Sequence, residues 1–140
     1  MISLNKEKNN IEVKLVKCSE EYWEFVRRLR TNTQVSSGFI KTDKITKHEQ
    51  LVYMSEYADN YRIALLDQIP CGFVGVVNGD IRVCTHPEYQ GKGIGKSMIS
   101  SISKVWPDAV AKIKIENKKS LELFKSCGYE IKYYLLEQTN

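Results

Sequence analysis

The clearest chemical signal in the 140-residue sequence is a glycine-rich stretch, Gln90-Gly91-Lys92-Gly93-Ile94-Gly95-Lys96. It follows a segment with the pattern of a β-strand and precedes one with helical periodicity. Backbone N–H groups at the start of a helix are unpaired, and with the helix dipole they bind anions such as phosphate. Glycines let the backbone approach a phosphate closely, and the two lysines add positive charge. The stretch therefore predicts an anion-binding loop at a helix start.

Two well-known phosphate-binding loops are excluded by spacing. A Walker A loop ends as Gly95-Lys96-Ser97 does, but its first glycine would have to stand where the sequence has Gln90. A Rossmann fingerprint that begins at Gly91 needs its third glycine at position 96, which is a lysine, and it follows a parallel strand rather than a hairpin. For the loop taken alone, a glycine-rich turn that binds nothing stays the alternative.

The first elements that position the loop are a strand and two helices. Residues 11–18 alternate apolar and polar side chains, which predicts a half-buried strand. Ser19 is a suitable N-cap for a helix that runs to about Thr31. A polar stretch follows, and then Thr46 and Glu49 have the spacing of a capping box, which predicts a second helix.

Three strands then lead to the loop. We predict strands over residues 61–66 and 71–77, separated by a turn around Pro70. Asn78-Gly79 is a strong two-residue hairpin signal because both residues tolerate a positive φ. Residues 81–85 should therefore return antiparallel to the preceding strand.

The C-terminal third alternates helix and strand patterns. We predict a helix over residues 93–105, a strand over 109–115, a helix from Asn117 to about Ser126, and a last strand over 129–136. The resulting order is β-α-α-β-β-β-α-β-α-β, which predicts an α/β fold with a mixed sheet.

Composition limits the class of protein. The 21 basic and 17 acidic residues leave a net charge of +4, too small a surplus to argue for nucleic acid as a partner. The length suits one domain, expected over residues 11–140 behind a flexible arm of residues 1–10. No run approaches the roughly 18 apolar residues of a membrane helix, and the polar start is not a secretory signal. We therefore expect a cytoplasmic protein without a membrane partner.

The four cysteines, Cys18, Cys71, Cys84 and Cys127, stand singly. They form no C-x-x-C pair and have no histidine at the spacing of metal ligands. In a reducing compartment free thiols are the default, so we expect neither disulfides nor a metal site.

The loop fits the pattern Q-x-x-G-x-G through Gln90, Gly93 and Gly95. In this respect the sequence resembles the GCN5-related N-acetyltransferase (GNAT) superfamily. The acyl-CoA loop of that family has the pattern Q/R-x-x-G-x-G/A. Residues 85–89, T-H-P-E-Y, resemble that family's V-x-P-E-Y/F. Residues 117–129 resemble its N-x-x-A-x-x-L-Y-x-K-x-G-F/Y. The resemblance spans residues 11–136 and implies a GNAT-like mixed, mostly antiparallel central sheet flanked by helices.

The resemblance also implies a substrate and its contacts. The acyl donor would be acetyl-CoA, with no metal. Its pyrophosphate would lie on the stretch formed by Gln90, Gly91, Lys92, Gly93, Ile94, Gly95 and Lys96. The backbone around Cys84 and Thr85 would bind the pantetheine arm and polarise the thioester carbonyl. Asn117 would contact the arm, and its other interpretation, as a helix N-cap, is equally natural.

In such enzymes the acceptor amine attacks the thioester directly, so a base or a water chain must take a proton from the amine. The candidate bases are His48, Glu49 and His86, with Asp80 as a fourth. Each has a structural alternative. Glu49 is the capping-box partner of Thr46, His48 a solvated helix residue, His86 the residue before a proline, and Asp80 part of the hairpin turn.

Phe124 departs from the family pattern. The resemblance places a tyrosine there to protonate the departing CoA thiolate, and phenylalanine has no proton to give. The acid would then be Tyr129, Ser126 or water, or the thiolate leaves unprotonated. Phe124 also keeps open a second function, a non-catalytic module that binds or senses acyl-CoA.

The acceptor would be set by residues 27–57, the first two helices and their connection. Arg27, Arg28 and Arg30, with Phe39 and the helix of His48, faintly resemble GNAT enzymes that acylate amino groups of nucleotide-linked sugars. Basic residues suit a phosphate-bearing acceptor, and a solvated helix face is the alternative. We expect a small-molecule amine as substrate, an aminosugar or its nucleotide conjugate among the candidates, and a monomer or homodimer.

Overall fold

The computed structural model describes residues 12–32 and 44–139. In chain order, its elements are strand β1 (Lys14–Lys17), 3₁₀ helix η1 (Glu20–Tyr22), helices α2 (Trp23–Arg30) and α4 (Lys47–Tyr57), 3₁₀ helix η2 (Ala58–Asn60), strands β2 (Tyr61–Leu66), β3 (Ile69–Val77) and β4 (Asp80–Thr85), 3₁₀ helix η3 (Pro87–Tyr89), and helices α5 (Ile94–Val105) and α6 (Lys118–Ser126). The expected arm of residues 1–10 and the acceptor candidate Phe39 lie outside the described residues.

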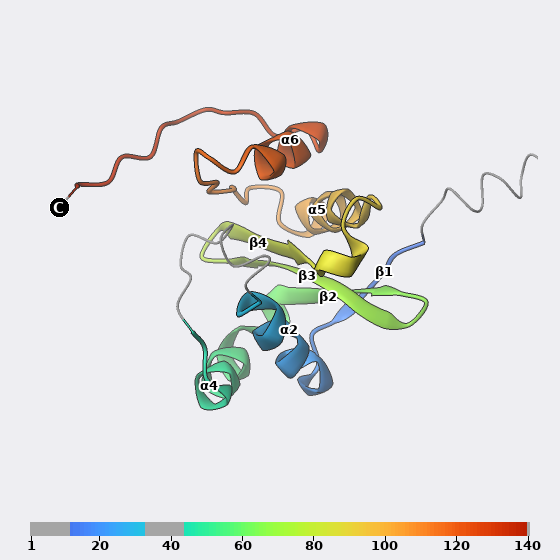
Figure 1. The fold of residues 1–140 in the computed structure, drawn as a ribbon. Coiled ribbons are helices and arrows are strands. Elements are labelled where there is room, and N and C mark those ends of the chain that lie inside the picture. The colour runs from blue at the N-terminus through green and yellow to red at the C-terminus, as the bar shows by residue number, and fades with distance from the viewer. Residues whose placement is uncertain (1–11, 33–43, 140) are drawn as a thin grey trace, which may run out of the picture.

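The four strands form one antiparallel sheet in the order β1-β2-β3-β4. Helices α2 and α4 lie on one face of the sheet, and α5 and α6 lie on the other (Figure 1). Each face has its own core. The α5 side buries mainly aliphatic side chains together with Phe124, and the α2 side buries a mixed set that includes Tyr61, Phe73 and Cys84. The predicted α/β class, with a mostly antiparallel central sheet flanked by helices, is confirmed.

The sequence signals for caps and turns have mixed outcomes. The capping box is confirmed, since Glu49 N donates to Thr46 Oγ1 at 3.1 Å and Thr46 N donates to Glu49 Oε1 at 3.0 Å. The Asn78-Gly79 hairpin is also confirmed, with φ of 52° and 80°. The first helix differs, because Ser19 precedes a 3₁₀ turn and α2 begins only at Trp23.

The turn between β2 and β3 was predicted in the wrong place. It is made by Asp67 and Gln68, with φ of 50° and 67°, and Pro70 lies inside β3 opposite Leu65. Proline has no N–H for a ladder and is tolerated in strands near irregular pairing. Here the register shifts beside it, between Ala64 and Leu65.

The predicted strand over residues 109–115 is wrong. Only one residue of it pairs, through a parallel bridge between Val110 and Asp80. Its alternating pattern instead reflects one-sided packing, because Ala109 is buried and Ala111 and Ile113 pack partly against the α5 core. Alternation shows that one face is covered and does not require a hydrogen-bonded neighbour.

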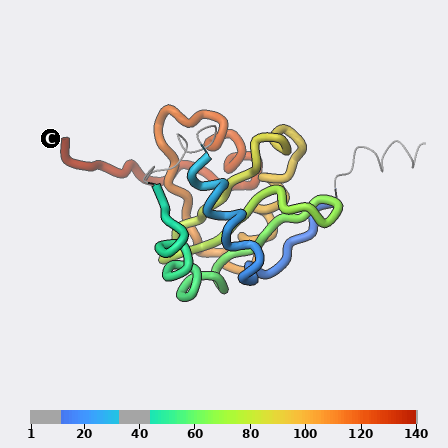
Figure 2. Tube along the Cα trace, turned by 60° about the horizontal axis from the view of Figure 1, so that its bottom comes forward, coloured from blue at the N-terminus to red at the C-terminus, as the bar shows by residue number. Residues whose placement is uncertain are grey.

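The predicted strand over residues 129–136 is also wrong. Tyr129 packs against Phe124 with ring centroids 5.3 Å apart, and the chain then leaves the core. Tyr133 and Tyr134 are 87% and 91% exposed, and the red C-terminal end of the chain runs away from the body of the molecule (Figure 2). Aromatic and β-branched residues favour a strand only where a neighbouring backbone offers partners.

No helix in residues 12–32 and 44–139 combines the length and apolar character needed to cross a bilayer.

Candidate active site

The glycine-rich loop forms the start of α5. Gly91 and Gly93 have φ of +79° and +82°, a left-handed conformation that favours glycine. Ser97 N donates to Gly93 O at 3.1 Å and closes the first turn. The N–H groups of Ile94, Gly95 and Lys96 come before that bond and are free to bind a ligand. The first turn of α5 holds no acidic residue that would compete with an anion.

Polar contacts tie the loop to the end of β4. Gln90 Nε2 donates to Thr85 O at 3.3 Å. His86 Nδ1 accepts a hydrogen bond from Glu88 N at 3.2 Å. Lys92 Nζ lies 5.8 Å from the centroid of the Tyr89 ring, and its side chain is exposed. The loop is therefore anchored beside the last residues of β4.

Helix α6 packs closely on the loop side of α5. A Cβ at Gly95 would come 3.0 Å from Leu123 Cδ2, so glycine allows the two helices to approach. Asn117 Oδ1 accepts a hydrogen bond from Ser120 N at 3.1 Å and caps α6, which confirms the N-cap interpretation.

One edge of β4 is open beside the loop. Cys84 and Thr85 pair with Phe73 and Gly72 of β3 on one side. On its other side, β4 has one paired residue within the described chain, Asp80, which forms a bridge with Val110. The backbone at the end of β4 is therefore available to an extended ligand that carries amide groups.

The cysteines are free and mostly buried. Burial raises the pKa of Cys84 to about 12, partly offset by the positive charge of Arg30. Burial likewise raises the pKa of Cys18 to about 11 and raises that of Cys71. These three thiols are protonated at neutral pH and are poor nucleophiles. This fits acyl transfer without an acyl-enzyme.

The candidate bases lie in different parts of the molecule. Glu49 is held in its capping box, and hydrogen bonds from Thr46, its backbone N–H first, lower the pKa of Glu49. His48 is exposed on α4, on the face of the sheet opposite α5 (Figure 1). Asp80 forms an ion pair with Lys112 at 3.3 Å. His86 alone among them adjoins the end of β4.

The candidate acids are held by structural contacts. Phe124 is 4% exposed in the core. The hydroxyls of Tyr129 and Ser103 lie 2.5 Å apart, so Tyr129 is held near the C-terminal half of α5. Ser126 Oγ donates to Leu123 O at 2.6 Å within its own helix.

A polar group on the α2 side of the sheet was missed in the sequence. The hydroxyls of Tyr53 and Tyr61 lie 2.7 Å apart, and the Arg30 guanidinium carbon lies 5.9 Å from the centroid of the Tyr53 ring. Arg82 of β4 shares this face through its register with Gly75. Strand register determines which side chains meet here, and the sequence carries no direct signal for it.

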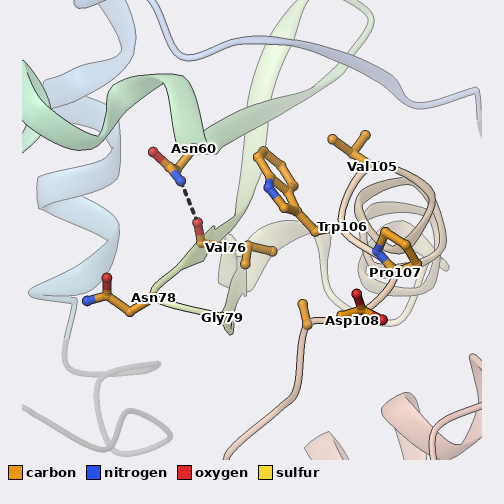
Figure 3. A pocket seen from close by; sticks show the side chains of 9 residues that line it. Asn60, Val76, Asn78, Gly79, Val105, Trp106, Pro107 and Asp108 are labelled. Carbon is orange, nitrogen blue, oxygen red and sulfur yellow. Dashed lines mark hydrogen bonds between the residues drawn. The ribbon is translucent and has the colours of Figure 1, made fainter.

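A separate cleft of about 250 Å³ lies at the other end of α5 (Figure 3). Its lining includes Asn78 and Gly79 from the hairpin and Trp106 and Pro107 from the end of α5. The loop precedes the first residue of α5, so this cleft is distinct from the anion-binding end. No group of three metal-ligating side chains occurs in the part of the chain that the structure describes.

A family model described as "Acetyltransferase (GNAT) domain" matches residues 57–131, more than half of the chain. The chain belongs to the GNAT acetyltransferase family. The matched segment contains the anchored loop and the open edge of β4, so the GNAT resemblance in the sequence is confirmed.

Solved GNAT structures share the fold at low sequence identity. Spermidine N-acetyltransferase from Vibrio cholerae, solved with CoA and spermine, is 18% identical with a TM-score of 0.74, covering 90% of this chain and 85% of that one. Ribosomal-protein-alanine N-acetyltransferase from Brucella melitensis is 13% identical with a TM-score of 0.71, covering 84% of each chain.

A domain from Methanocaldococcus jannaschii is 20% identical with a TM-score of 0.73, covering 86% of this chain and 90% of that one. No curated protein sequence matches significantly. The names of the acetyltransferases show that one GNAT fold serves different acceptors, so the fold does not choose the acceptor of this chain.

Proposed function

We propose that this GNAT protein moves the acetyl group of acetyl-CoA to the primary amine of a small molecule. The observation that carries the proposal is the start of α5, where backbone N–H groups without a partner in their own helix lie next to the open edge of β4. A phosphate group and an amide-bearing arm fit these two features together. Few ligands combine both, and acyl-CoA is one of them.

Each part of the donor has a candidate partner in the chain. The pyrophosphate binds the N–H groups from Gly91 to Lys96, with Lys92 and Lys96 as exposed counter-charges. The pantetheine arm lies along Cys84 and Thr85, whose backbone also polarises the thioester carbonyl. Asn117 contacts the arm while it caps α6.

The reaction is a direct displacement. The amine nitrogen attacks the thioester carbonyl carbon, the C–N bond forms, and the C–S bond breaks to release the CoA thiolate. The nitrogen loses one proton to a base or water, and the thiolate takes one up, so the products are an N-acetyl amine and CoA.

His86 is the preferred base among the four candidates. Its ring lies at the end of β4. Because Nδ1 accepts a hydrogen bond from Glu88 N, the proton of the neutral ring is on Nε2, so His86 takes a proton from the amine through Nδ1, directly or through water, once the contact with Glu88 opens. Glu49 and Asp80 are held in other polar contacts, and His48 lies on an exposed helix start. His86→Gln should lower kcat while leaving acetyl-CoA affinity unchanged.

Thiol release from acetyl-CoA across a panel of amines tests the proposal. The panel includes aminosugars and their nucleotide conjugates. Calorimetry measures acetyl-CoA affinity in Gly93→Val, with Gly79→Val as the matched control, since both glycines have φ near +80° and no atom within 4 Å of an added Cβ. Only Gly93→Val should weaken binding. Equal affinity in wild type and Gly93→Val would remove the loop from the donor site.

A non-catalytic module that binds acyl-CoA is the second candidate. Phe124 favours it, because this buried ring has no proton for the CoA thiolate and the Tyr129 hydroxyl is held by Ser103. Tight CoA binding without turnover on any amine of the panel would select this function.

A further inference from the structure

One row of paired residues crosses the sheet on the face covered by α2 and α4. Tyr61 of β2 is the register partner of Gly75 in β3, and Gly75 is the partner of Arg82 in β4. A Cβ at Gly75 would come 2.6 Å from Tyr61 Cδ1. The Tyr61 ring therefore covers the glycine and fills the space between its own strand and that of Arg82.

Two helices close over the same row. The Tyr61 hydroxyl lies 2.7 Å from the Tyr53 hydroxyl of α4, and the Arg30 guanidinium of α2 stands over the Tyr53 ring. Burial raises the pKa of Tyr61, while Arg82 and Arg30 act on it in the opposite direction. Both cations are thus close enough to influence one protonated phenol.

The arginines of this region differ in their partners. Arg27 binds the Glu24 carboxylate and the Ile45 carbonyl. Arg28 binds Glu24 as well, and Arg62 donates to Asp59 O.

Over residues 12–32 and 44–139, neither Arg30 nor Arg82 forms an ion pair or donates a hydrogen bond.

Both unpaired arginines are half-buried. A guanidinium carries five N–H donors and stays charged at any physiological pH, so partial burial without an acceptor is unfavourable. An oxyanion satisfies it best, since carboxylate and phosphate oxygens match the planar donor fork. Of the two tyrosine hydroxyls beside the arginines, one donates to the other, which leaves one hydroxyl proton as a further donor to the same anion.

The row is close to the donor end. Arg82 precedes Cys84 by two residues and shares its face of the sheet, which corresponds to about 7 Å along a strand. We propose that Arg30 and Arg82 bind a carboxylate or phosphate of the acceptor, so that the acceptor is a small primary amine with an oxyanion a few bonds from its nitrogen. This inference rests on the proposed acetyltransferase function and names its substrate class.

Matched acceptor pairs test the inference. Glucosamine is compared with glucosamine 6-phosphate, and 3-aminopropanol with β-alanine, at saturating acetyl-CoA. The phosphate and carboxylate arms distinguish the two sources of the oxyanion. In at least one pair, the anionic member should have a kcat/KM about tenfold to a hundredfold higher, as expected for charge-assisted hydrogen bonds.

Variants separate these two arginines from general charge effects. Arg30→Gln and Arg82→Gln should remove most of the anionic preference, mainly through KM, and leave acetyl-CoA affinity within twofold of wild type. Arg82→Lys, which keeps the positive charge, should retain part of the preference for the anionic acceptor. Arg28→Gln and Arg62→Gln are controls that alter the same net charge and should keep the preference. Equal rates for both members of each pair, or equal losses in the controls, would overturn the inference.

A binding measurement keeps the inference testable if no amine is acetylated. If acetyl-CoA binds but no amine is acetylated, the proposed enzyme activity is refuted. The anion site is then tested on its own by a binding measurement. Titration with inorganic phosphate, followed by the arginine Nε–H signals in NMR, should then shift Arg30 and Arg82 and leave Arg62 unchanged. Absence of a shift at both would overturn the site itself.

Discussion

The proposed donor loop (residues 90–96) and the proposed acceptor face (Arg30, Tyr53, Tyr61 and Arg82) are built by different means. The loop at the start of α5 is made of consecutive residues, and its binding groups are backbone N–H groups set by glycines at positive φ. The acceptor face collects side chains from α2, α4, β2 and β4. A backbone site tolerates side-chain change but not a Cβ at Gly93, whereas a side-chain site can change its ligand by single substitutions.

The largest expected effect comes from adding a side chain at Gly75, where the Tyr61 ring already fills the space. In Gly75→Val, the new side chain meets the Tyr61 ring at 2.6 Å and Asn60 O at 2.8 Å, and this backbone atom cannot move aside. The free energy of unfolding should fall by about 2–3 kcal/mol, as for other overpacked cores. Denaturant titration measures the loss. An unchanged midpoint would show that the Tyr61 ring does not lie over Gly75.

Charge removal at the loop should weaken the donor site. Lys92→Ala with Lys96→Ala should lower acetyl-CoA affinity by about tenfold at low salt, with a smaller loss at high salt because both lysines are exposed. Calorimetry at two ionic strengths measures it. Lys104→Ala, an exposed lysine at the other end of α5, is the control and should bind as wild type does. A loss that does not depend on salt contradicts the electrostatic explanation.

Alkaline pH should destabilise the protein through its buried thiols. The pKa of Cys84 rises to about 12 in the folded state from an ordinary value of 9.0, so above pH 9 the unfolded chain binds fewer protons than the folded one. Stability should therefore fall from pH 9 upward, by about 1 kcal/mol per pH unit for each such thiol.

Denaturant titration at pH 7, 9 and 10 tests this expectation for wild type and Cys84→Ala. The variant should lose less stability between pH 7 and pH 10 than wild type does. Parallel pH profiles of the two proteins would show that the Cys84 thiol ionises equally in the folded and unfolded states, and that this thiol is open to water in the folded protein.

The smallest expected effect separates two roles of Asn117. Asn117→Ala removes the cap of α6 and should cost about 1 kcal/mol of stability, while Asn117→Ser keeps a capping oxygen. If Asn117 also contacts the donor, both variants should bind acetyl-CoA more weakly by calorimetry. Thr46→Ala, which removes a cap on α4, should cost similar stability and leave affinity unchanged. Wild-type affinity in both Asn117 variants would restrict this residue to capping.

The sequence predicted the features that depend on neighbouring residues. The glycine loop, the Asn78-Gly79 hairpin and the Thr46–Glu49 capping box each lie within a few residues, and each has a residue type with a specific backbone preference. The Asp67-Gln68 turn was missed because neither residue is the glycine that usually marks a positive φ.

Features that depend on distant partners were not predictable in the same way. The patterns of residues 109–115 and 129–136 resemble strands, but hydrogen-bonded neighbours decide whether a strand forms. Among the basic residues of α2, only contacts in the folded chain separate Arg27, which Glu24 holds, from Arg30, which has no ion-pair partner among the described residues. Arg82 joins Arg30 only through strand register.

The most direct test measures two constants in two variants. Acetyl-CoA affinity and acceptor KM are determined for wild type, Gly93→Val and Arg82→Gln. We predict that Gly93→Val weakens acetyl-CoA binding at least about tenfold and keeps acceptor KM within twofold at saturating donor, and that Arg82→Gln does the reverse. Unchanged acetyl-CoA affinity in Gly93→Val would contradict the assignment of the loop to the donor and, with it, the proposed arrangement of the site.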